Sequence, residues 1–352
     1  SLRSFEWQLV DRQIRQALPI SIRRRGNAAA HQLDCWESKT LCVTDEGQVT
    51  ASEFGNDPLW DFQDTMRATA ARWCPPKDGE SVGSNGSIDA VVGFYDGSIR
   101  RIAGSGNVIS KSEWQPRGGI YDLATSPQDK VAACFGDTGV LLCDSRTFSI
   151  EREWMIPTRM SSLEFDSLAQ VLGGCGLDGR LYRFDSKSKD PSVIEGNDQF
   201  SIPYALDWQW IGPDEGIVLT RQAVLHVRLD GVETQLVQSV PLDSGAGWTV
   251  MRASDSERFL LGNGAGQLRE FEWSKTSAME ASVSIETGSR SIYRFDSAIR
   301  DLDFDSESGS PVVALSDGFV AKLENLKKSE KSDLYNDKLR KKQKMTAECV
   351  LE

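Results

Sequence analysis

The sequence predicts an all-β chain in which seven similar units of four short strands close into a single ring. Three observations carry this prediction. The chain has 352 residues, of which 39% are hydrophobic and 26% charged, so it has enough apolar material for a large core. Seven segments repeat one pattern of an apolar strand, a tight turn and a second alternating strand. Successive turns lie 40 to 52 residues apart, a spacing typical of repeat architectures.

The repeated pattern is that of a β-hairpin. Most of its turns contain a glycine, usually preceded by an acidic residue, and glycine favours such turns because it tolerates positive backbone φ. The hairpins are LCVTDEGQVTASEF (41–54), AVVGFYDGSIRRI (90–102), VAACFGDTGVLLCD (131–144), VLGGCGLDGRLYRFD (171–185), GIVLTRQAVLHVRLD (216–230), FLLGNGAGQLREFEW (259–273) and PVVALSDGFVAKLEN (311–325). Their turn residues are Gly47, Gly97, Gly139, Gly179, Gln222 with Ala223, Gly266 and Gly318.

A third strand precedes each hairpin, and a fourth follows most of them. The preceding strands are HQLDCW (31–36), TAARWC (69–74), GIYDLATSP (119–127), MSSLEFDS (160–167), YALDWQW (204–210), WTVMRAS (248–254) and IRDLDFDS (299–306). Following strands include VISKSEW (108–114) and FSIEREW (148–154), whose Glu-Trp pairs lie 40 residues apart. Seven units of four strands predict a seven-bladed β-propeller, whose apolar residues, Trp208 and Trp210 among them, pack blade against blade.

The units resemble those of WD-repeat β-propellers over about residues 20–326. In that family the third strand often ends in Trp-Asp, and here a different apolar residue precedes the carboxylate. The corresponding pairs are Cys143-Asp144, Phe184-Asp185, Leu229-Asp230, Phe271-Glu272 and Leu323-Glu324. The Gly-His dipeptide that opens family repeats is absent, so the Asp-His-Ser/Thr-Trp network of that family cannot form. A divergent propeller of another kind is the alternative.

The N-terminal residues are expected to close the ring and extend beyond it. The propeller is expected over 19–326, and its last unit shows only three strands, so residues 19–25 are expected to supply the missing outer strand and remove an unpaired edge. Residues 1–18 are predicted to form a short helical extension, with Trp7 and Ile14 on its apolar face. That helix either caps the rim of the ring or docks a partner.

The C-terminal residues 327–352 are expected to form a basic tail outside the propeller. They contain eight Lys or Arg against five Asp or Glu, although the whole chain carries a net charge of −12. The tail includes the cluster Arg340, Lys341 and Lys342. Such clusters are typical of nuclear import signals or of contacts to RNA or an acidic partner, and a solvated flexible tail is the alternative.

Composition and charge narrow the classes of function. The net charge of −12 and a pI of about 4.9 argue against a body that coats nucleic acid, and no apolar run reaches the roughly 18 residues of a membrane span. The seven cysteines are scattered, which argues against a disulfide framework or zinc module. The two histidines, His31 and His226, are each expected to pack in the fold. We therefore predict no catalytic residue, metal, cofactor or small-molecule substrate.

Binding residues are the more promising candidates. The basic clusters of the ring are Arg23, Arg24 and Arg25, and Arg100 and Arg101. Such arginines either pair with acids on the rim of the ring or bind acidic peptides or phosphate bidentately. The loops 76–89 and 274–298 exceed ordinary connections, and insertions in repeat proteins tend to gather on a binding face.

One short motif indicates a different class of protein. The segment CDSR (143–146) resembles the Trp-Asp-x-Arg box by which many WD-repeat substrate receptors join a cullin-RING ubiquitin ligase. Asp144 and Arg146 fit that box, and Cys143 replaces its tryptophan. The resemblance implies a ligase substrate receptor that binds its adaptor through Asp144 and Arg146.

We predict a non-enzymatic scaffold or adaptor subunit of a larger assembly, which binds protein partners through the propeller faces and the terminal extensions. Nuclear WD-repeat proteins with Lys-rich C-terminal tails, ribosome-assembly factors among them, are similar in architecture. That similarity and the basic tail favour the nucleus over the cytoplasm for an intracellular protein, and the basic tail 327–352 is the candidate for peripheral RNA contact. The alternatives are the ligase receptor and a propeller hydrolase or esterase.

Overall fold

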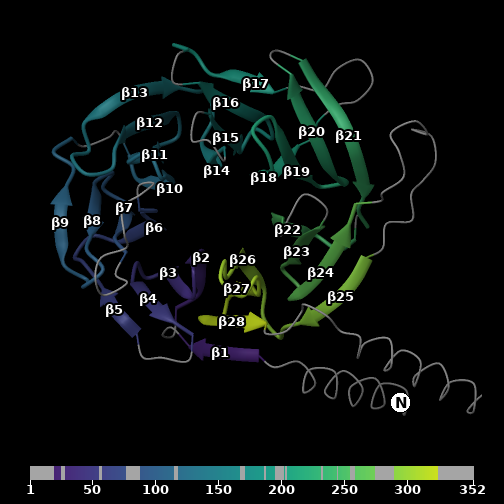
Figure 1. The fold of residues 1–352 in the computed structure, drawn as a ribbon, viewed down its shortest axis with the longest axis horizontal. Helices are drawn as coiled ribbons and strands as arrows, with labels where there is room; N and C mark the ends of the chain where they lie inside the picture. The colour runs from purple at the N-terminus through teal and green to yellow at the C-terminus, as the bar shows by residue number, and fades with distance from the viewer. Residues whose placement is uncertain are drawn as a thin grey trace, which may run out of the picture.

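The chain forms a ring of seven four-stranded antiparallel sheets, the blades (Figure 1). The computed structural model describes residues 20–24, 28–54, 58–76, 88–114, 118–166, 171–185, 188–194, 202, 204–230, 233–243, 245–253, 258–273 and 289–323. These residues contain no helix, and so no helical membrane span. The predicted all-β seven-bladed propeller is confirmed. The predicted helix in 1–18 and the tail 327–352 lie outside the described residues.

Each blade consists of an inner, a second, a third and an outer strand. The inner strands are β2 (Ala30–Trp36), β6 (Ala68–Trp73), β10 (Ile120–Ser126), β14 (Met160–Phe165), β18 (Ala205–Trp210), β22 (Trp248–Ala253) and β26 (Ile299–Phe304). The second strands are β3 (Lys39–Thr44), β7 (Ala90–Phe94), β11 (Lys130–Phe135), β15 (Val171–Gly176), β19 (Glu215–Thr220), β23 (Arg258–Asn263) and β27 (Pro311–Leu315). Blades 1 to 7 are numbered in this order.

The remaining strands complete the blades toward the outside of the ring. The third strands are β4 (Val49–Glu53), β8 (Ile99–Ile102), β12 (Gly139–Asp144), β16 (Leu181–Asp185), β20 (Ala223–Asp230), β24 (Gln267–Glu272) and β28 (Phe319–Leu323). The outer strands are β5 (Pro58–Phe62), β9 (Val108–Lys111), β13 (Ile150–Met155), β17 (Ser192–Ile194), β21 (Glu233–Pro241), β25 (Ser289–Arg294) and β1 (Ile20–Arg24).

The hydrophobic core lies between the blades, as seven clusters of buried side chains at the seven junctions of the ring. Second strands such as β7 and β15 are buried along their whole length, because a neighbouring blade covers each of their faces. Trp208 and Trp210 of blade 5 pack with Val171 of blade 4, which confirms the predicted inter-blade packing. Burial of one large apolar side chain at such a junction contributes roughly 1.5–3 kcal/mol to stability.

The two Glu-Trp repeats of the sequence have one structural role. The indole of Trp114, just after β9, donates to the carbonyl of Phe148 in the next blade at 2.6 Å. The indole of Trp154 in β13 donates to the carbonyl of Ser188, again in the next blade, at 3.2 Å. Both bonds join residues 34 positions apart, so the sequence repeat preserves a contact between neighbouring blades.

Most predicted turn glycines adopt the backbone that the hairpins require. Positive φ angles of 73° to 84° occur at Gly47, Gly97, Gly179, Gly266 and Gly318. The assignment of Gly139 to the turn of the third hairpin was wrong, because Gly139 begins β12 and Gly136 takes the positive φ of 54°. Gly139 has a packing role instead, since a Cβ there would lie 2.1 Å from the ring of Phe135.

One predicted loop is also corrected by the structure. The segment 274–298 does not form a single long loop, because Ser289–Arg294 is β25, the outer strand of blade 6. Its sequence, SRSIYR, has too few apolar residues to indicate a strand by alternation. The loop 76–89 is described only at its ends, where Ile88 is buried in the core between blades 1 and 2.

The ring closes through strands from opposite ends of the described chain. β1 pairs antiparallel with β28, from Ile20 opposite Leu323 to Arg24 opposite Phe319. Figure 1 shows this purple strand beside the yellow one, as the outer strand of blade 7. β1 is therefore the outer strand predicted for residues 19–25, and it covers the edge that β28 would otherwise expose.

Removal of residues 1–26 tests this closure. We expect the truncated chain to lose at least about 5 °C in Tm, because blade 7 loses its outer strand and the ladder of hydrogen bonds to β28. Differential scanning calorimetry measures the shift, and a chain lacking only residues 1–18, which retains β1, is the matched control. Equal melting temperatures for the two truncated chains would contradict the closing role of β1.

Candidate functional site

Every inner strand has a β-bulge at the same place, near its first residue. The register of the inner strand against the second strand shifts there in all seven blades. A bulge adds one residue and redirects side chains. The bulged residues are His31, Thr69, Tyr121, Ser161, Leu206, Thr249 and Arg300, and all of them line one cavity at the centre of the ring. The seven bulges therefore shape a central channel.

The channel has a volume of about 530 Å³ and a strongly charged lining. All seven inner strands contribute residues to it. Its acidic residues are Asp34, Asp122, Glu164, Asp207 and Asp301, and its basic residues are Arg72, Arg252 and Arg300. A cavity with this many ionisable groups is the first place to look for chemistry, so the partners of each group decide what the channel does.

The first residue after the bulge connects one blade to the next. In four blades this residue is an acid or an amide whose side-chain oxygen accepts a backbone N–H from the following inner strand. The four bonds run from Ala71 N–H to Gln32 at 2.8 Å, from Leu163 to Asp122 at 2.8 Å, from Met251 to Asp207 at 3.0 Å and from Leu33 to Asp301 at 2.8 Å. Each bond satisfies a backbone donor that points away from its own sheet.

The residue two positions further along the inner strand repeats the same contact. The four bonds run from Trp73 N–H to Asp34 at 2.6 Å, from Trp210 to Glu164 at 2.8 Å, from Ala253 to Gln209 at 2.6 Å and from Cys35 to Asp303 at 2.7 Å. With the first set, these bonds span the five junctions that follow blades 1, 3, 4, 5 and 7. The junctions after blades 2 and 6 lack such a bond among the described residues.

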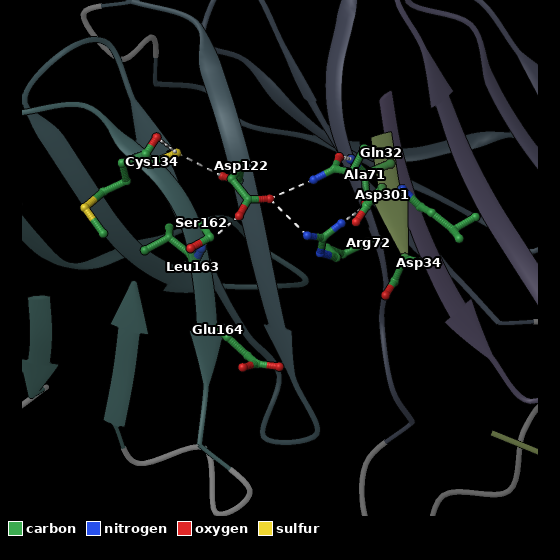
Figure 2. Close-up of polar contacts among 12 residues, drawn as sticks. Gln32, Asp34, Ala71, Arg72, Asp122, Cys134, Ser162, Leu163, Glu164 and Asp301 are labelled. Atoms are coloured by element: carbon green, nitrogen blue, oxygen red, sulfur yellow. Dashed lines mark hydrogen bonds and ion pairs between the residues drawn. The ribbon is translucent and has the colours of Figure 1, made fainter. Parts of the chain in front are cut away.

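At this second position of the inner strand, blades 2 and 6 carry an arginine, whereas the other blades carry an acid, an amide or alanine. Arg72 of blade 2 donates to Asp122 of blade 3 at 3.1 Å, and Gln32 donates to the same carboxylate at 2.7 Å (Figure 2). Arg252 of blade 6 lies 3.5 Å from Asp303 of blade 7. Each arginine thus crosses a junction that lacks the backbone bond, and both bring positive charge to the acidic channel.

Burial in the channel changes the ionisation of its carboxyl groups. Loss of solvent raises the pKa of Asp34 to about 7, that of Glu164 to about 7 and that of Asp207 to about 6. Burial also raises the pKa of Asp301, and the neighbouring arginines oppose the rise. Asp34 and Glu164, whose carboxyl oxygens also hold neighbouring blades together, therefore have pKa values near neutral pH.

The described histidines and cysteines lack the partners of a nucleophilic site. His31 contacts the Thr69 carbonyl at 3.1 Å and Asp45 at 3.3 Å, and His226 lies 3.1 Å from Glu215, with its ring 5.6 Å from that of Trp273. Burial raises the pKa of the Cys74 and Cys143 thiols to about 12, which keeps both protonated. Within the described ranges no group of three His, Cys, Asp or Glu could hold a metal ion.

The arginines predicted on strand β8 are engaged within the fold. Arg100 binds both carboxylate oxygens of Asp64, and its guanidinium lies 4.4 Å from the ring of Phe94. Arg101 donates to Asp89 at 2.8 Å. Both side chains are largely buried. Of the two roles considered for this pair, the geometry favours the intramolecular ion pairs.

The other predicted basic and apolar residues are only partly described. Arg23 and Arg24 lie on β1, where their backbones pair with Val320 and Phe319. The remaining candidates lie outside the described residues, and their binding roles stay predictions: Trp7, Ile14, Arg25, Arg340, Lys341 and Lys342.

The predicted Asp144 and Arg146 box lies at the turn after β12. The Asp144 carboxylate accepts the backbone N–H of Arg146 at 3.0 Å and that of Thr147 at 2.8 Å, so it stabilises its own turn. The Arg146 side chain is half exposed and donates to Asp129 at 3.1 Å. Cys143, which replaces the tryptophan of the box, is fully buried. The box therefore presents neither an indole nor the thiol at the surface. Adaptor binding through these residues stays a prediction.

Substitution of Asp122 tests the structural role of the channel acids. We expect Asp122→Ala to lower the free energy of unfolding by about 3 kcal/mol, because it leaves Leu163 N–H and the Arg72 guanidinium without their buried acceptor. Urea unfolding followed by tryptophan fluorescence measures the change. The control is Asp137→Ala at an exposed turn, which we expect to change stability by less than about 0.5 kcal/mol. Equal effects of the two substitutions would contradict the assignment.

The raised carboxyl pKa values predict a pH dependence of stability. A carboxyl whose pKa is raised by folding binds more protons in the folded state, so its contribution to stability is lost as pH rises through about 7. We expect Glu164→Gln, which keeps an acceptor for Trp210 N–H, to raise the urea midpoint relative to wild type more at about pH 8 than at about pH 5. Burial lowers the pKa of His226, so protonation of this residue below about pH 6.5 destabilises the wild type and the variant alike. A constant offset between them would contradict this prediction.

Solved structures of other proteins share this fold. No protein-family model matches the chain, and no curated protein is similar to it in sequence. Among solved structures, 1792 chains are similar, so the fold by itself selects no single activity. One is a chain in the crystal structure of the mitotic checkpoint complex, with a TM-score of 0.66 and 12% identity over 86% of this chain and 94% of that one. The protein is thus a seven-bladed β-propeller in its fold.

Proposed function

We propose that the protein is a non-catalytic scaffold that holds other proteins on the faces and rim of its propeller. The observation that carries this proposal is the use of the channel carboxyl groups. Eight acid or amide side chains of the inner strands accept backbone N–H groups of the neighbouring blade, as described above. Groups committed to joining blades cannot move toward a substrate without opening the ring.

The exposed surface supports the same proposal. Large apolar side chains are exposed on several blades, including Tyr95 at 58%, Met155 at 60%, Ile109 at 54% and Leu177 at 45%. Single exposed apolar residues are ordinary, but a rigid ring presents them at fixed positions over a broad area. The similar chain named above belongs to the mitotic checkpoint complex, a multi-protein assembly, which is consistent with a scaffold role.

The setting of this scaffold is a finer proposal. The proposed setting is a nuclear assembly, such as one in ribosome biogenesis, with RNA contact through the tail 327–352. Two features support it: the basic composition of that segment and the resemblance to nuclear WD-repeat proteins with Lys-rich tails. The alternative roles are the ligase substrate receptor, which requires adaptor contact at Asp144 and Arg146, and the propeller hydrolase or esterase.

Native complexes test the scaffold proposal directly. We expect the tagged chain, recovered by gentle lysis at native expression, to elute well above the mass of its own 39.0 kDa and to carry other subunits in fixed ratio. Size exclusion followed by quantitative mass spectrometry measures both. Loss of one subunit on Asp144→Ala would support the ligase alternative. Elution at the mass of the chain alone, together with turnover of a small substrate, would overturn the scaffold proposal.

Localisation tests the proposed role of the tail. We expect a fluorescent fusion carrying Arg340→Ala, Lys341→Ala and Lys342→Ala to leave the nucleus, because an import receptor reads clustered basic charge. The control is Lys331→Ala, which removes one charge from the same tail and leaves both the 340–342 cluster and the Lys327–Lys328 pair unchanged. A nuclear fraction that is unchanged in the triple variant, or equally reduced in the control, would count against an import signal at 340–342.

A further inference from the structure

Two equivalent positions in each blade lie on the same face of the propeller. One is the residue just before the inner strand, and the other is the residue just after the second strand. In five blades the first residue's carbonyl accepts the second residue's N–H, in the pairs Ala29 with Asp45, Arg67 with Tyr95, Gly119 with Gly136, Arg159 with Leu177, and Ala298 with Ser316. The corresponding residues are Tyr204 and Arg221 in blade 5, and Gly247 and Gly264 in blade 6.

These positions differ in size and charge around the ring. Blades 1, 3, 6 and 7 carry only alanine, glycine, serine or aspartate there. Blades 4 and 5 are adjacent, and both carry an arginine together with a large apolar or aromatic residue. Arg159, Leu177, Tyr204 and Arg221 are therefore an exception to the repeat, and we call them the blade 4–5 patch. Blade 2 carries a similar pair, Arg67 and Tyr95, which the glycines of blade 3 separate from the patch.

The four residues of the blade 4–5 patch are in continuous contact. Leu177 N–H donates to the Arg159 carbonyl at 2.8 Å, and the Tyr204 hydroxyl donates to the Leu177 carbonyl at 2.8 Å. The Arg221 guanidinium lies 4.5 Å from the centre of the Tyr204 ring, and that of Arg159 lies 4.6 Å from the ring of Tyr121. Because Tyr121 lines the channel, the patch extends from the channel toward blade 5.

Tyr204 is exposed and yet held in place. Its side chain is 42% exposed, and Leu177 beside it is 45% exposed. The ring lies directly over Gly179, where an added Cβ would come within 2.5 Å of it, and the hydroxyl is fixed by its bond to Leu177. Gly179 has a φ of 80°, so the turn itself also requires glycine. A partner that covers this tyrosine loses little additional side-chain entropy, which favours binding.

The charge of the patch is opposite to that of the chain. Among the described residues neither Arg159 nor Arg221 forms an ion pair, and each lies over an aromatic ring instead. Arg180 adds a third guanidinium, whose side chain is 59% exposed. Within the described part of the chain it forms an ion pair with Asp178 alone, at 4.0 Å. A second acid, Asp243, follows Leu242, whose N–H donates to the carbonyl of Gln222 next to Arg221. The patch is therefore a positive and aromatic area on a protein of net charge −12.

We propose that the blade 4–5 patch binds an acidic linear peptide that carries a large apolar residue. The apolar residue would cover Leu177 and Tyr204, and flanking carboxylates would pair with Arg159, Arg221 and Arg180. Tyrosine and arginine are the residue types that contribute most to binding at interfaces, and a guanidinium pairs with a carboxylate bidentately. This inference rests on the proposed scaffold function and specifies the chemistry of one partner.

A peptide library tests the proposal with a defined probe. A random dodecapeptide phage library is panned against the full-length protein, and selected peptides are synthesised with a fluorescent label for anisotropy. We expect selected sequences to be enriched in Asp and Glu around Leu or an aromatic residue. The variant Arg159→Glu with Arg221→Glu should weaken their binding at least about tenfold, and Tyr204→Ala should also weaken it. The control on blade 2, Arg67→Glu with Tyr95→Ala, alters the same residue types at the equivalent positions and should leave binding within about twofold.

Several outcomes would overturn the assignment. They are selected peptides without acidic enrichment, binding that survives the blade 4–5 substitutions, and equal loss in the blade 2 control, which would indicate general charge repulsion. Tighter binding of a labelled single-stranded dodecauridylate than of any selected peptide, lost in the same variant, would assign the patch to nucleic acid and also overturn it. Native complexes that persist in the patch variant would preserve the scaffold proposal and contradict peptide binding at the patch. Failure of the patch proposal is therefore distinguishable from failure of the scaffold proposal.

Discussion

One interaction recurs at five of the seven blade junctions, and the centre of the ring is organised around it: a side-chain oxygen on the inner strand of one blade accepts a backbone N–H from the inner strand of the next. Seven blades must meet at the centre, where each inner strand has an edge that no strand of its own sheet covers. Acids and amides at two positions after the bulge provide acceptors for that edge, as Asp34 does for Trp73 and Asp303 for Cys35. An unmet buried N–H would cost about 1–3 kcal/mol at each site, so the channel is polar for structural reasons.

This arrangement places several carboxyl groups in the buried channel, and two arginines of the inner strands offset their negative charge. Arg72 and Arg252 lie at the junctions without a described backbone bond, and each faces a carboxylate of the following blade. Raised pKa values at Asp34 and Glu164 show that charge relief by protonation is also within reach near neutral pH. A set of carboxyl groups with perturbed pKa values is often a sign of catalysis. Here burial raises the pKa values, and the buried oxygens accept hydrogen bonds from backbone amides of the next blade, which gives them a structural role. Binding is therefore expected on the faces of the ring, where the repeat is broken by residues such as Tyr204 and Arg221.

The architecture could be predicted from the sequence because short-range sequence patterns determine the strands and turns of each blade. Alternating strands and turn glycines such as Gly97 and Gly318 act within one hairpin, so they are legible without knowledge of distant contacts. The errors fell where local pattern is weak, as at β25, whose sequence SRSIYR is mostly polar, and at Gly139, whose small size serves the Phe135 ring. The channel network was missed although its signal was present, since polar residues recur inside apolar inner strands such as YALDWQW and IRDLDFDS. Their partners lie about 40 or more residues away, in another blade, and only the fold reveals the pairing.

Hydrogen exchange at Leu163 tests the central claim most directly, because its N–H bonds to the Asp122 carboxylate and not to a strand of its own sheet. In the wild-type protein this amide should be protected like those within the blade ladders. In Asp122→Ala it should exchange far faster under conditions where the protein stays folded, while the ladder amides of β15 keep their protection. Protection of the Leu163 amide that is unchanged by the substitution would show that the channel acids do not hold the blades together.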